Sequence, residues 1–263
     1  MMRALWSAAS GMKTQQDNMD VVAHNLANVN TFGAKKVRAE FHDLLYQTLR
    51  PAGAESGADS QYPTGLAIGM GTKFSATNRL FTQGALQTTD NPTDIAIQGE
   101  GFFRVELPDG TIGYTRDGTF KLDSNRRLVT TDGYPLADGI TIDETAPSDS
   151  IVIAADGQVS CTPAGGEQQA VGQITLARFV NPSGLTAIGK NLFVTSAASG
   201  DAIEGNPGEE GAGSLVQGAL EMSNVQIVEE MVEMIIAQRA YESNSKAITT
   251  SDSMLEIANG LKR

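Results

Sequence analysis

The sequence holds one cysteine and two histidines among its 263 residues. The single cysteine, Cys161, cannot form a disulfide within the chain, so it neither requires nor excludes an oxidising compartment. The two histidines, His24 and His42, lack the paired His or Cys spacing of a zinc site. No serine lies in a Gly-X-Ser-X-Gly nucleophile elbow. We therefore expect no catalytic residues, no metal and no cofactor, and we expect that the protein is not an enzyme.

Basic residues are also scarce, with 19 Lys and Arg against 31 Asp and Glu and a net charge of −12. Such a chain has no basic surface to displace counterions from phosphates, which argues against a nucleic-acid partner. Long uncharged apolar runs are absent, which argues against a membrane span. The start of the chain, from Met1 to Met12, has a diluted apolar run and no convincing cleavage site, so we expect no cleaved signal peptide.

Proline is absent from residues 221–263, where Gly260 is the only glycine. This stretch predicts one long helix from Ser223 onward, with Ser223 and Gln226 forming a capping box. Large side chains recur in it at a spacing of seven, the period of a coiled-coil seam: Ile227, Met234, Tyr241, Ile248 and Leu255. A second seam carries mostly short side chains, which would let a neighbouring backbone come close: Glu230, Ala237, Asn244, Ser251 and Ala258.

A second long helix is predicted over residues 3–29, where seam positions alternate at spacings of three and four: Leu5, Ala8, Met12, Gln15, Met19, Val22, Leu26 and Val29. An ordinary core helix is the alternative for the C-terminal stretch, but its length of about 60 Å is large for this chain. Pairing the two helices with each other, and with copies from neighbouring subunits, would bury both stripes. The predicted assembly interface comprises Leu5, Met12, Met19, Val22, Leu26, Ile227, Met231, Met234, Tyr241, Ile248 and Leu255.

Between the first helix and the middle of the chain lie a turn and a segment of low hydrophobicity. The turn is predicted to use left-handed backbone positions and side-chain caps at Asn25, Asn28, Asn30, Thr31 and Gly33. Apolar residues over 37–49 suggest a short amphipathic helix: Val37, Phe41, Leu44, Leu45 and Leu49. Residues 50–65 have almost nothing to bury, so we expect them to be disordered or loosely extended in a monomer.

In the middle of the chain the pattern of apolar residues changes from helical spacing to alternation. The whole sequence has 28 glycines and only 6% aromatic residues, which favours a small β core with long connections. Candidate strands are Thr72–Ala76, Ile95–Gln98, Phe102–Leu107, Thr111–Arg116, Thr119–Leu122, Arg127–Thr131, Ile151–Ala154, Val171–Phe179 and Asn191–Thr195. Asp-Gly pairs between them predict turns, with glycines at 110, 118, 133, 139 and 157. A calcium site is the alternative, but no loop has the ligand spacing of an EF-hand. Gly99-Glu100-Gly101 lacks a third glycine and is interpreted as a strand bend.

These patterns predict an α+β protein whose long terminal helices form a coiled-coil assembly element around a central β-rich domain. The expected organisation is an N-terminal helix over 1–35, a short helix and an extended segment between subunits over 36–70, a β-rich domain over 71–217 and a C-terminal helix over 218–263.

Several motifs, in order along nearly the whole chain, resemble the rod and hook family of axial proteins of the bacterial flagellum, and most closely its distal rod members. At the start they are Met2-Arg3-Ala4-Leu5-Trp6, Ala8-Ala9-Ser10-Gly11-Met12 and Asn25-Leu26-Ala27-Asn28-Val29-Asn30-Thr31. In the middle they are Phe81-Thr82-Gln83-Gly84, Asp90-Asn91-Pro92, Ile97-Gln98-Gly99-Glu100-Gly101-Phe102-Phe103 and Tyr114-Thr115-Arg116-Asp117-Gly118. At the end they are Ser223-Asn224-Val225, Glu230-Met231, Gln238-Arg239-Ala240-Tyr241-Glu242 and Asn244. One departure is Phe32-Gly33-Ala34-Lys35, where the family more usually has a second Thr and then Gly-Phe-Lys.

The resemblance implies a structural subunit that is exported by the flagellar type III apparatus and polymerises into a hollow helical rod across the periplasm. That rod would transmit torque from the motor to the hook. The implied partners are other copies of the chain, proximal rod proteins, the hook protein and the ring proteins of the peptidoglycan and outer membrane. A hook or proximal rod subunit is the alternative within the family. A β-rich enzyme or glycan-binding module with helical oligomerisation ends is the alternative from a different class.

Overall fold

A computed structural model describes residues 2–57, 60–143, 147, 150–163, 168–209 and 211–260. The chain forms two compact units. The helical unit comprises Met1–Ala27, Val37–Asn78 and Gln226–Arg263, and the β-rich unit comprises Asn28–Lys36 and Arg79–Val225. Two long helices and a β-rich middle confirm the predicted α+β class.

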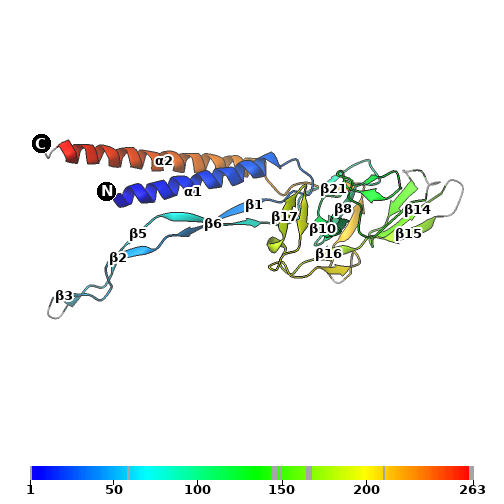
Figure 1. The fold of residues 1–263 in the computed structure, drawn as a ribbon, viewed down its shortest axis with the longest axis horizontal. Coiled ribbons are helices and arrows are strands. Elements are labelled where there is room, and N and C mark those ends of the chain that lie inside the picture. Colours follow the sequence, from blue (N-terminus) through cyan, green and yellow to red (C-terminus); the bar gives the residue numbers. More distant parts are fainter. Residues whose placement is uncertain are drawn as a thin grey trace. The chain divides into compact units, whose positions relative to one another are not determined.

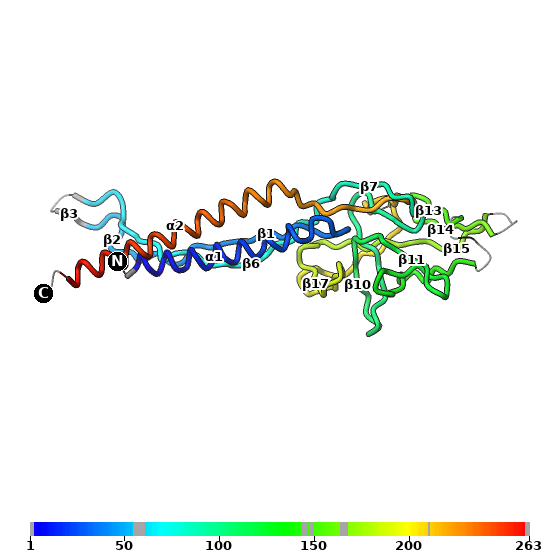
Figure 2. Tube along the Cα trace, turned by 90° about the horizontal axis from the view of Figure 1, so that it is seen from above, coloured from blue at the N-terminus to red at the C-terminus, as the bar shows by residue number. Residues whose placement is uncertain are grey.

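In the helical unit, α1 (Met2–Ala27) and α2 (Ile227–Gly260) lie side by side and run antiparallel (Figures 1 and 2). The predicted N-terminal helix is confirmed to within two residues at its end. The predicted capping box is wrong, because α2 begins only at Ile227. The carbonyl of Gln226 accepts the Glu230 N–H at 3.1 Å, which makes Gln226 the residue that precedes the first helical turn. The Ser223 hydroxyl instead accepts the Val225 N–H at 3.3 Å.

A two-stranded ribbon follows in the same unit, drawn in blue and cyan in Figure 1. It consists of three strand pairs: β1 (Val37–Asp43) with β6 (Thr72–Arg79), β2 (Tyr46–Arg50) with β5 (Leu66–Gly69), and β3 (Glu55–Gly57) with β4 (Ser60–Gln61). The short helix predicted over 37–49 is therefore wrong. The backbone groups of β1 and β2 instead pair with the facing strands β6 and β5. The Phe41 and Phe74 rings pack edge to face across β1 and β6, with centroids 5.8 Å apart.

Residues 50–65, predicted to be disordered or loosely extended, form the far end of this ribbon. The structure does not describe residues 58 and 59 within this segment. The Gly53 N–H donates to the Tyr62 carbonyl and the Tyr62 N–H to the Ala54 carbonyl, each at 2.9 Å. The Arg50 guanidinium lies 3.5 Å above the centre of the Tyr62 ring. A cation over an aromatic face is attractive, so this end is paired although it buries few apolar atoms.

The β-rich unit is built from short antiparallel strands. They are β7 (Leu86–Thr88), β8 (Ile95–Gln98), β9 (Phe102–Glu106), β10 (Ile112–Thr115), β11 (Lys121–Leu122), β12 (Leu128–Val129), β13 (Ile151–Ile153), β14 (Gln158–Cys161), β15 (Gln169–Gln173), β16 (Leu176–Arg178), β17 (Thr186–Gly189), β18 (Leu192–Val194), β19 (Ile203–Gly205), β20 (Ser214–Gln217) and β21 (Ala219–Glu221). Its largest sheet has the order β17-β18-β10-β9-β16-β19, and smaller sheets have the orders β13-β14-β15, β20-β8 and β21-β7.

Most predicted strands of this unit are present with shifted ends, and Ile95–Gln98 is confirmed at both ends. The strand predicted over Val171–Phe179 is two strands, β15 and β16, which belong to different sheets. Ile174, between them, is fully buried in the core. An apolar run of this kind does not reveal that the chain changes sheets inside it, because both halves have the same alternating pattern.

The core of this unit combines apolar side chains from most of its sheets. Phe103, Phe120, Leu128, Ile174 and Leu176 are all fully buried. The rings of Phe103 and Phe120 pack edge to face at 5.1 Å. Four of the predicted Asp-Gly turns have a glycine at positive φ, at 110, 133, 139 and 157. The fifth, Gly118, is needed for a different reason, because a Cβ there would overlap the Ile95 carbonyl oxygen.

Candidate assembly surfaces and the buried ion cluster

The pairing of α1 with α2 has a constant register. Gly11 lies against Asn244, whose amide nitrogen would be 2.8 Å from a Cβ added to Gly11. Asn25 donates from Nδ2 to Glu230 Oε2 at 3.0 Å. Moving 14 residues along α1 thus moves 14 residues back along α2, as in a straight antiparallel pair. Ala237 and Glu230 are buried in this contact, so the seam with short side chains does admit a neighbouring backbone.

The predicted interface residues divide between this contact and the surface. On α1, Val22 is buried, whereas Leu5, Met12, Met19 and Leu26 are half-buried. On α2, Met234, Ile248 and Leu255 are half-buried, whereas Ile227, Met231 and Tyr241 are exposed. The seven-spaced stripe of α2 therefore lies at the edge of the contact between the helices and partly outside it.

A second apolar stripe on α2 was missed by the sequence reasoning. Val228, Val232, Ile235 and Ile236 are 73%, 49%, 56% and 62% exposed, and Met231 beside them is 52% exposed. Residues 228, 232 and 235 are spaced by four and three, so they share one face of the helix. The signal was present in the sequence, but the seven-residue repeat alone does not detect it. We refer to these five residues as the outer stripe.

Of the predicted turn residues, only Gly33 adopts a left-handed backbone conformation. Asn25 lies inside α1, and Asn28 and Asn30 do not adopt positive φ, so this part of the prediction is wrong. Gly33 does have a positive φ of 68°, and a Cβ there would lie 2.6 Å from the Asp117 nitrogen. Asn28 contributes backbone and side-chain oxygens, which accept the Thr31 N–H at 3.1 Å and the Thr31 hydroxyl at 3.3 Å.

Asn25 reaches from α1 to the first residue of the ribbon. Its Oδ1 accepts the Val37 N–H at 2.9 Å, and its Nδ2 donates to the Val37 carbonyl at 2.8 Å. The remaining Nδ2 hydrogen is donated to Glu230, which is fully buried on α2. One amide side chain therefore joins three elements of the helical unit, and nothing in its neighbours along the sequence indicates this.

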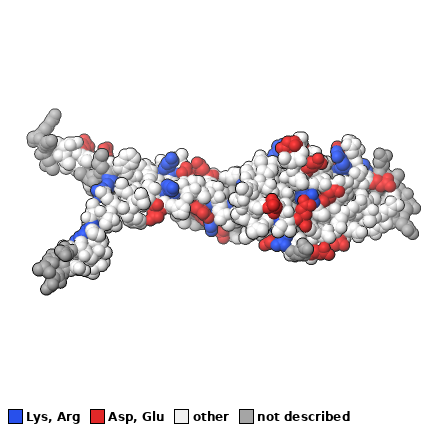
Figure 3. All heavy atoms as spheres, turned by 60° about the horizontal axis from the view of Figure 1, so that its bottom comes forward, with Lys and Arg blue, Asp and Glu red and all other residues white. Residues whose placement is uncertain are grey.

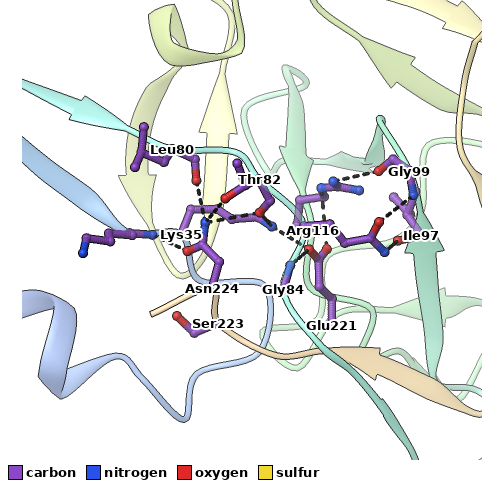
Figure 4. Close-up of polar contacts among 12 residues, drawn as sticks. Lys35, Leu80, Thr82, Gly84, Ile97, Gly99, Arg116, Glu221, Ser223 and Asn224 are labelled. Carbon is purple, nitrogen blue, oxygen red and sulfur yellow. Dashed lines mark hydrogen bonds and ion pairs between the residues drawn. The ribbon is translucent and has the colours of Figure 1, made fainter. Parts of the chain in front are cut away.

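The β-rich unit encloses a cluster of three charged side chains (Figure 4). Glu221, at the end of β21, has a fully buried side chain. Its Oε1 accepts from Lys35 Nζ at 2.5 Å and from the Gly84 N–H at 2.9 Å. Its Oε2 lies 3.6 Å from Nε of Arg116. The carboxylate is thus held between two cations that come from distant parts of the sequence.

The cations of this cluster have backbone partners as well. Lys35 Nζ donates to the Thr82 carbonyl at 2.8 Å, and Arg116 Nη2 donates to the Gly99 carbonyl at 2.9 Å. Burial lowers the pKa of Lys35, against the opposing attraction of Glu221, and the charge of Arg116 adds to the lowering. Burial also lowers the pKa of Arg116, and Glu221 opposes that shift. Removing one partner of a buried ion pair leaves an uncompensated charge, at a cost of about 3–5 kcal/mol.

The chain segments that lead to and from the helices converge beside this cluster. Asn224 accepts the Lys36 N–H through Oδ1 at 2.7 Å and donates from Nδ2 to the Leu80 carbonyl at 2.9 Å. The Gly33 N–H donates to the Glu221 carbonyl at 2.8 Å. Lys35, Arg116 and Asn224 lie within motifs quoted above, whereas the sequence reasoning did not single out Glu221. Its signal is a charged residue at the end of an otherwise apolar strand.

Acidic and basic side chains are interspersed on the face shown in Figure 3, without a continuous basic patch among the residues drawn. Within the described ranges, no three or more His, Cys, Asp or Glu side chains gather to hold a metal ion. Neither described long helix has the length and hydropathy needed to cross a membrane.

Three family models match successive parts of the chain and define its class. A flagella basal body rod protein model matches residues 5–35, a flagellar hook protein FlgE/F/G D1 domain model matches residues 96–161, and a flagellar basal body rod FlgEFG protein C-terminal model matches residues 216–261. The first range covers α1 from Leu5 onward, the third contains α2, and the middle range contains much of the β-rich core.

Full-length relatives narrow this class. The chain is 57% identical to the flagellar basal-body rod protein FlgG of Borreliella burgdorferi over 100% of both chains. It is 48% identical to that of Caulobacter vibrioides over 99% of this chain and 100% of the relative, and 44% identical to that of Bacillus subtilis over 100% of both. The chain therefore belongs to the FlgG family of flagellar basal-body rod proteins. It is a structural subunit of the rod, and its place is the basal body of the bacterial flagellum.

Proposed function

We propose that this chain polymerises with copies of itself into the distal part of the rod, a hollow helical shaft that crosses the periplasm and transmits torque from the motor to the hook. Its similarity to rod proteins over the full length of the chain supports this role. A shaft that carries torque needs long elements joined along its axis and lateral contacts between neighbours.

The observation that carries the proposal is the outer stripe of α2. Single exposed apolar residues are ordinary, but adjacent ones at helical spacing form a face that a partner covers. Val228 is 73% exposed and Ile236 is 62% exposed, so the contact with α1 leaves this face open. In a rod built from identical subunits, the partner that meets each such face is another copy.

The assembly interface that we propose contains the predicted residues together with the outer stripe. Leu5, Met12, Met19 and Leu26 are half-buried on α1, so each has surface left for a neighbour. The ribbon adds further exposed side chains, since Leu45 is 88% exposed and Tyr46 is 59% exposed. A two-stranded ribbon alone is marginally stable in water, which favours a neighbouring subunit as its support.

The remaining partners follow from the family. We propose that the shaft joins proximal rod proteins at one end and the hook protein at the other, and turns inside ring proteins of the peptidoglycan and outer membrane. We also propose export through the flagellar type III apparatus without a cleaved signal peptide.

Electron microscopy of concentrated purified protein tests the proposal. We expect straight hollow tubes from the parent chain and none from an Ile235→Asp variant, because that change places a charge within the outer stripe. Wavy tubes would indicate a hook-like subunit instead. A stable dimer without tubes would contradict polymerisation through these faces.

A further inference from the structure

Two polar side chains of α1 bond to the backbone of the β1–β6 strand pair at its opposite ends. They are Asn25, near the end of α1, and Ser10, near its start. We propose that Asn25 and Ser10 are positioning residues that hold the β1–β6 part of the ribbon along α1 and so direct the remainder, residues 44–71, toward a neighbouring copy. The presence of a neighbouring copy rests on the function proposed above. The contacts by which Asn25 and Ser10 hold the ribbon along α1 do not.

Asn25 takes the place of a strand neighbour for Val37. An antiparallel neighbour exchanges both backbone hydrogen bonds with the residue opposite, and the Asn25 amide makes both, with the Val37 N–H at 2.9 Å and the Val37 carbonyl at 2.8 Å. The side chain is 3% exposed. Its last hydrogen is donated to Glu230 on α2, so every hydrogen-bonding hydrogen of the amide is used.

Ser10 holds the other end of the same strand pair. Its hydroxyl oxygen accepts the Thr72 N–H at 3.3 Å while its hydrogen is donated to the Ser7 carbonyl at 2.8 Å. The residue before Thr72 is Gly71, with a φ of 108°. A Cβ at Gly71 would overlap the Ser10 hydroxyl, so this glycine permits the close approach of the ribbon to the helix.

The two tie points match in spacing. Asn25 and Ser10 are 15 residues apart, which is about 22 Å along a helix. From Val37 to Leu44, whose N–H donates to the Gly71 carbonyl at 2.9 Å, seven strand residues span about 23 Å. The length of β1 therefore matches the distance along α1 between Asn25 and Ser10. Both views show β1 alongside α1 (Figures 1 and 2).

Hydrogen exchange at individual amides of the full chain tests this. Each variant is compared with the parent in the same state, as tubes where these form and otherwise in solution. We expect exchange of the Val37 amide to rise about tenfold in Asn25→Ala, because its hydrogen bond is lost. Asn25→Asp keeps an acceptor for that amide but places a second carboxyl group against buried Glu230 and the Val37 carbonyl, so we expect exchange at Val37 to rise in this variant too.

Ser10 provides a second and milder pair of variants. Ser10→Ala should raise exchange of the Thr72 amide a few-fold, and Ser10→Thr, which keeps the hydroxyl, should restore its protection. Exposed Gln16 on the same helix supplies the control, so Gln16→Ala should leave both amides unchanged. The Asn25→Ala and Ser10→Ala double variant should raise exchange throughout β1 and β6 but not in the middle of α1.

A general loss of structure would raise exchange in the helices as much as in the ribbon, and that result would overturn the proposal. Parent-like exchange of Val37 and Thr72 in the double variant would also overturn it, as would the absence of protection at Val37 in every state of the parent. Protection at Val37 is expected in the tubes, because the helical unit is expected to order on assembly. Failure of the parent to form tubes would contradict the proposed function while the exchange pattern still decides the role of Asn25 and Ser10.

Discussion

The two units of this molecule differ in how far one chain completes them. In the β-rich unit, Phe103, Phe120 and Ile174 are all fully buried. In the helical unit, Leu45 is 88% exposed, Val228 73% and Trp6 71%. The β-rich unit has a large apolar core of its own, although single residues such as Val180 are exposed (83%), whereas the helical unit presents apolar side chains along α2 and the ribbon to solvent. The difference supports our proposal that a neighbouring copy completes the helical unit.

The contact between the two helices explains why they do not complete each other. Its best-buried positions on α2 are Glu230 and Ala237, one polar and one small. The buried residues of α1 are Ala8, Thr14, Val22 and Asn25, of which only Val22 has a branched apolar side chain. Small and polar side chains contribute little apolar burial, and ordering each residue of a helix costs roughly 1–2 kcal/mol of conformational entropy. The pairing therefore gives close approach with little hydrophobic stabilisation.

The largest expected difference between the helical and the β-rich unit is that only the β-rich unit is folded in dilute solution. We expect α1 and α2 to be largely unfolded before assembly, so limited proteolysis should remove them and leave a resistant fragment within about residues 79–225. Mass spectrometry of the fragments measures this. Helical ends that resist protease as well as the middle does would show that the helical unit is complete without a neighbour.

A large effect confined to the β-rich unit is expected from Glu221→Ala. The change leaves Lys35 and Arg116 buried without their anion, at a cost of about 3–5 kcal/mol in the free energy of unfolding. Glu204→Ala is the matched control, because Glu204 also pairs with an arginine but has a side chain that is 47% exposed. The control should lose at most about 1 kcal/mol. Equal urea midpoints for the two variants would show that the buried cluster contributes no special stability.

An effect confined to assembly is expected from Ile235→Asp and Met234→Asp. Each change puts an unpaired charge into the proposed contact between subunits, which should cost about 2–3 kcal/mol of association free energy per subunit. Tube formation and motility should fail, and the melting of the β-rich unit should not change. Ser243→Asp, at an exposed polar position of α2, is the control. Normal motility in Ile235→Asp would remove the outer stripe from the interface, and normal motility in Met234→Asp would remove the seven-spaced stripe.

The smallest effect on stability, although a visible one on shape, is expected from deleting residues 52–63. Arg50 and Leu66 are paired across the ribbon, so the shortened chain can close between them. The subunit should fold and polymerise, but the tube should be curved and more compliant because a segment wedged between subunits resists their sliding. Cryo-electron microscopy decides this, since a straight tube of unchanged stiffness would make the segment a passive loop.

The sequence predicted the helices and the strands of the core because their signals are local. Seam spacing placed the N-terminal helix, and the alternating pattern before the bend at Gly99-Glu100-Gly101 placed Ile95–Gln98 at both ends. It failed over 37–49, where Val37 and Phe41 fit a helical face as well as a strand face. There the choice depends on β6, a partner that lies some thirty residues later in the chain.

The candidate site divides in the same way. Met234 and Leu26 were predicted as interface residues because they repeat along their own helices, whereas Glu221, Lys35 and Arg116 belong to separate stretches and carry no shared pattern. Their ion pairs form only because the fold brings the ends of the β-rich unit together. Asn25 was placed in the right motif with the wrong role, since its partners Val37 and Glu230 are supplied by other elements.

By itself, the sequence determined the class of secondary structure, the extent of the N-terminal helix, the positions of most turns and the resemblance to the rod and hook family, because periodicity, turn chemistry and motif order are properties of neighbouring residues. Only the tertiary structure decided which helix face stays exposed, how the ribbon is tied to α1 and which charges are buried together. Those features depend on distances between segments that are far apart in the chain, and local preference does not encode them.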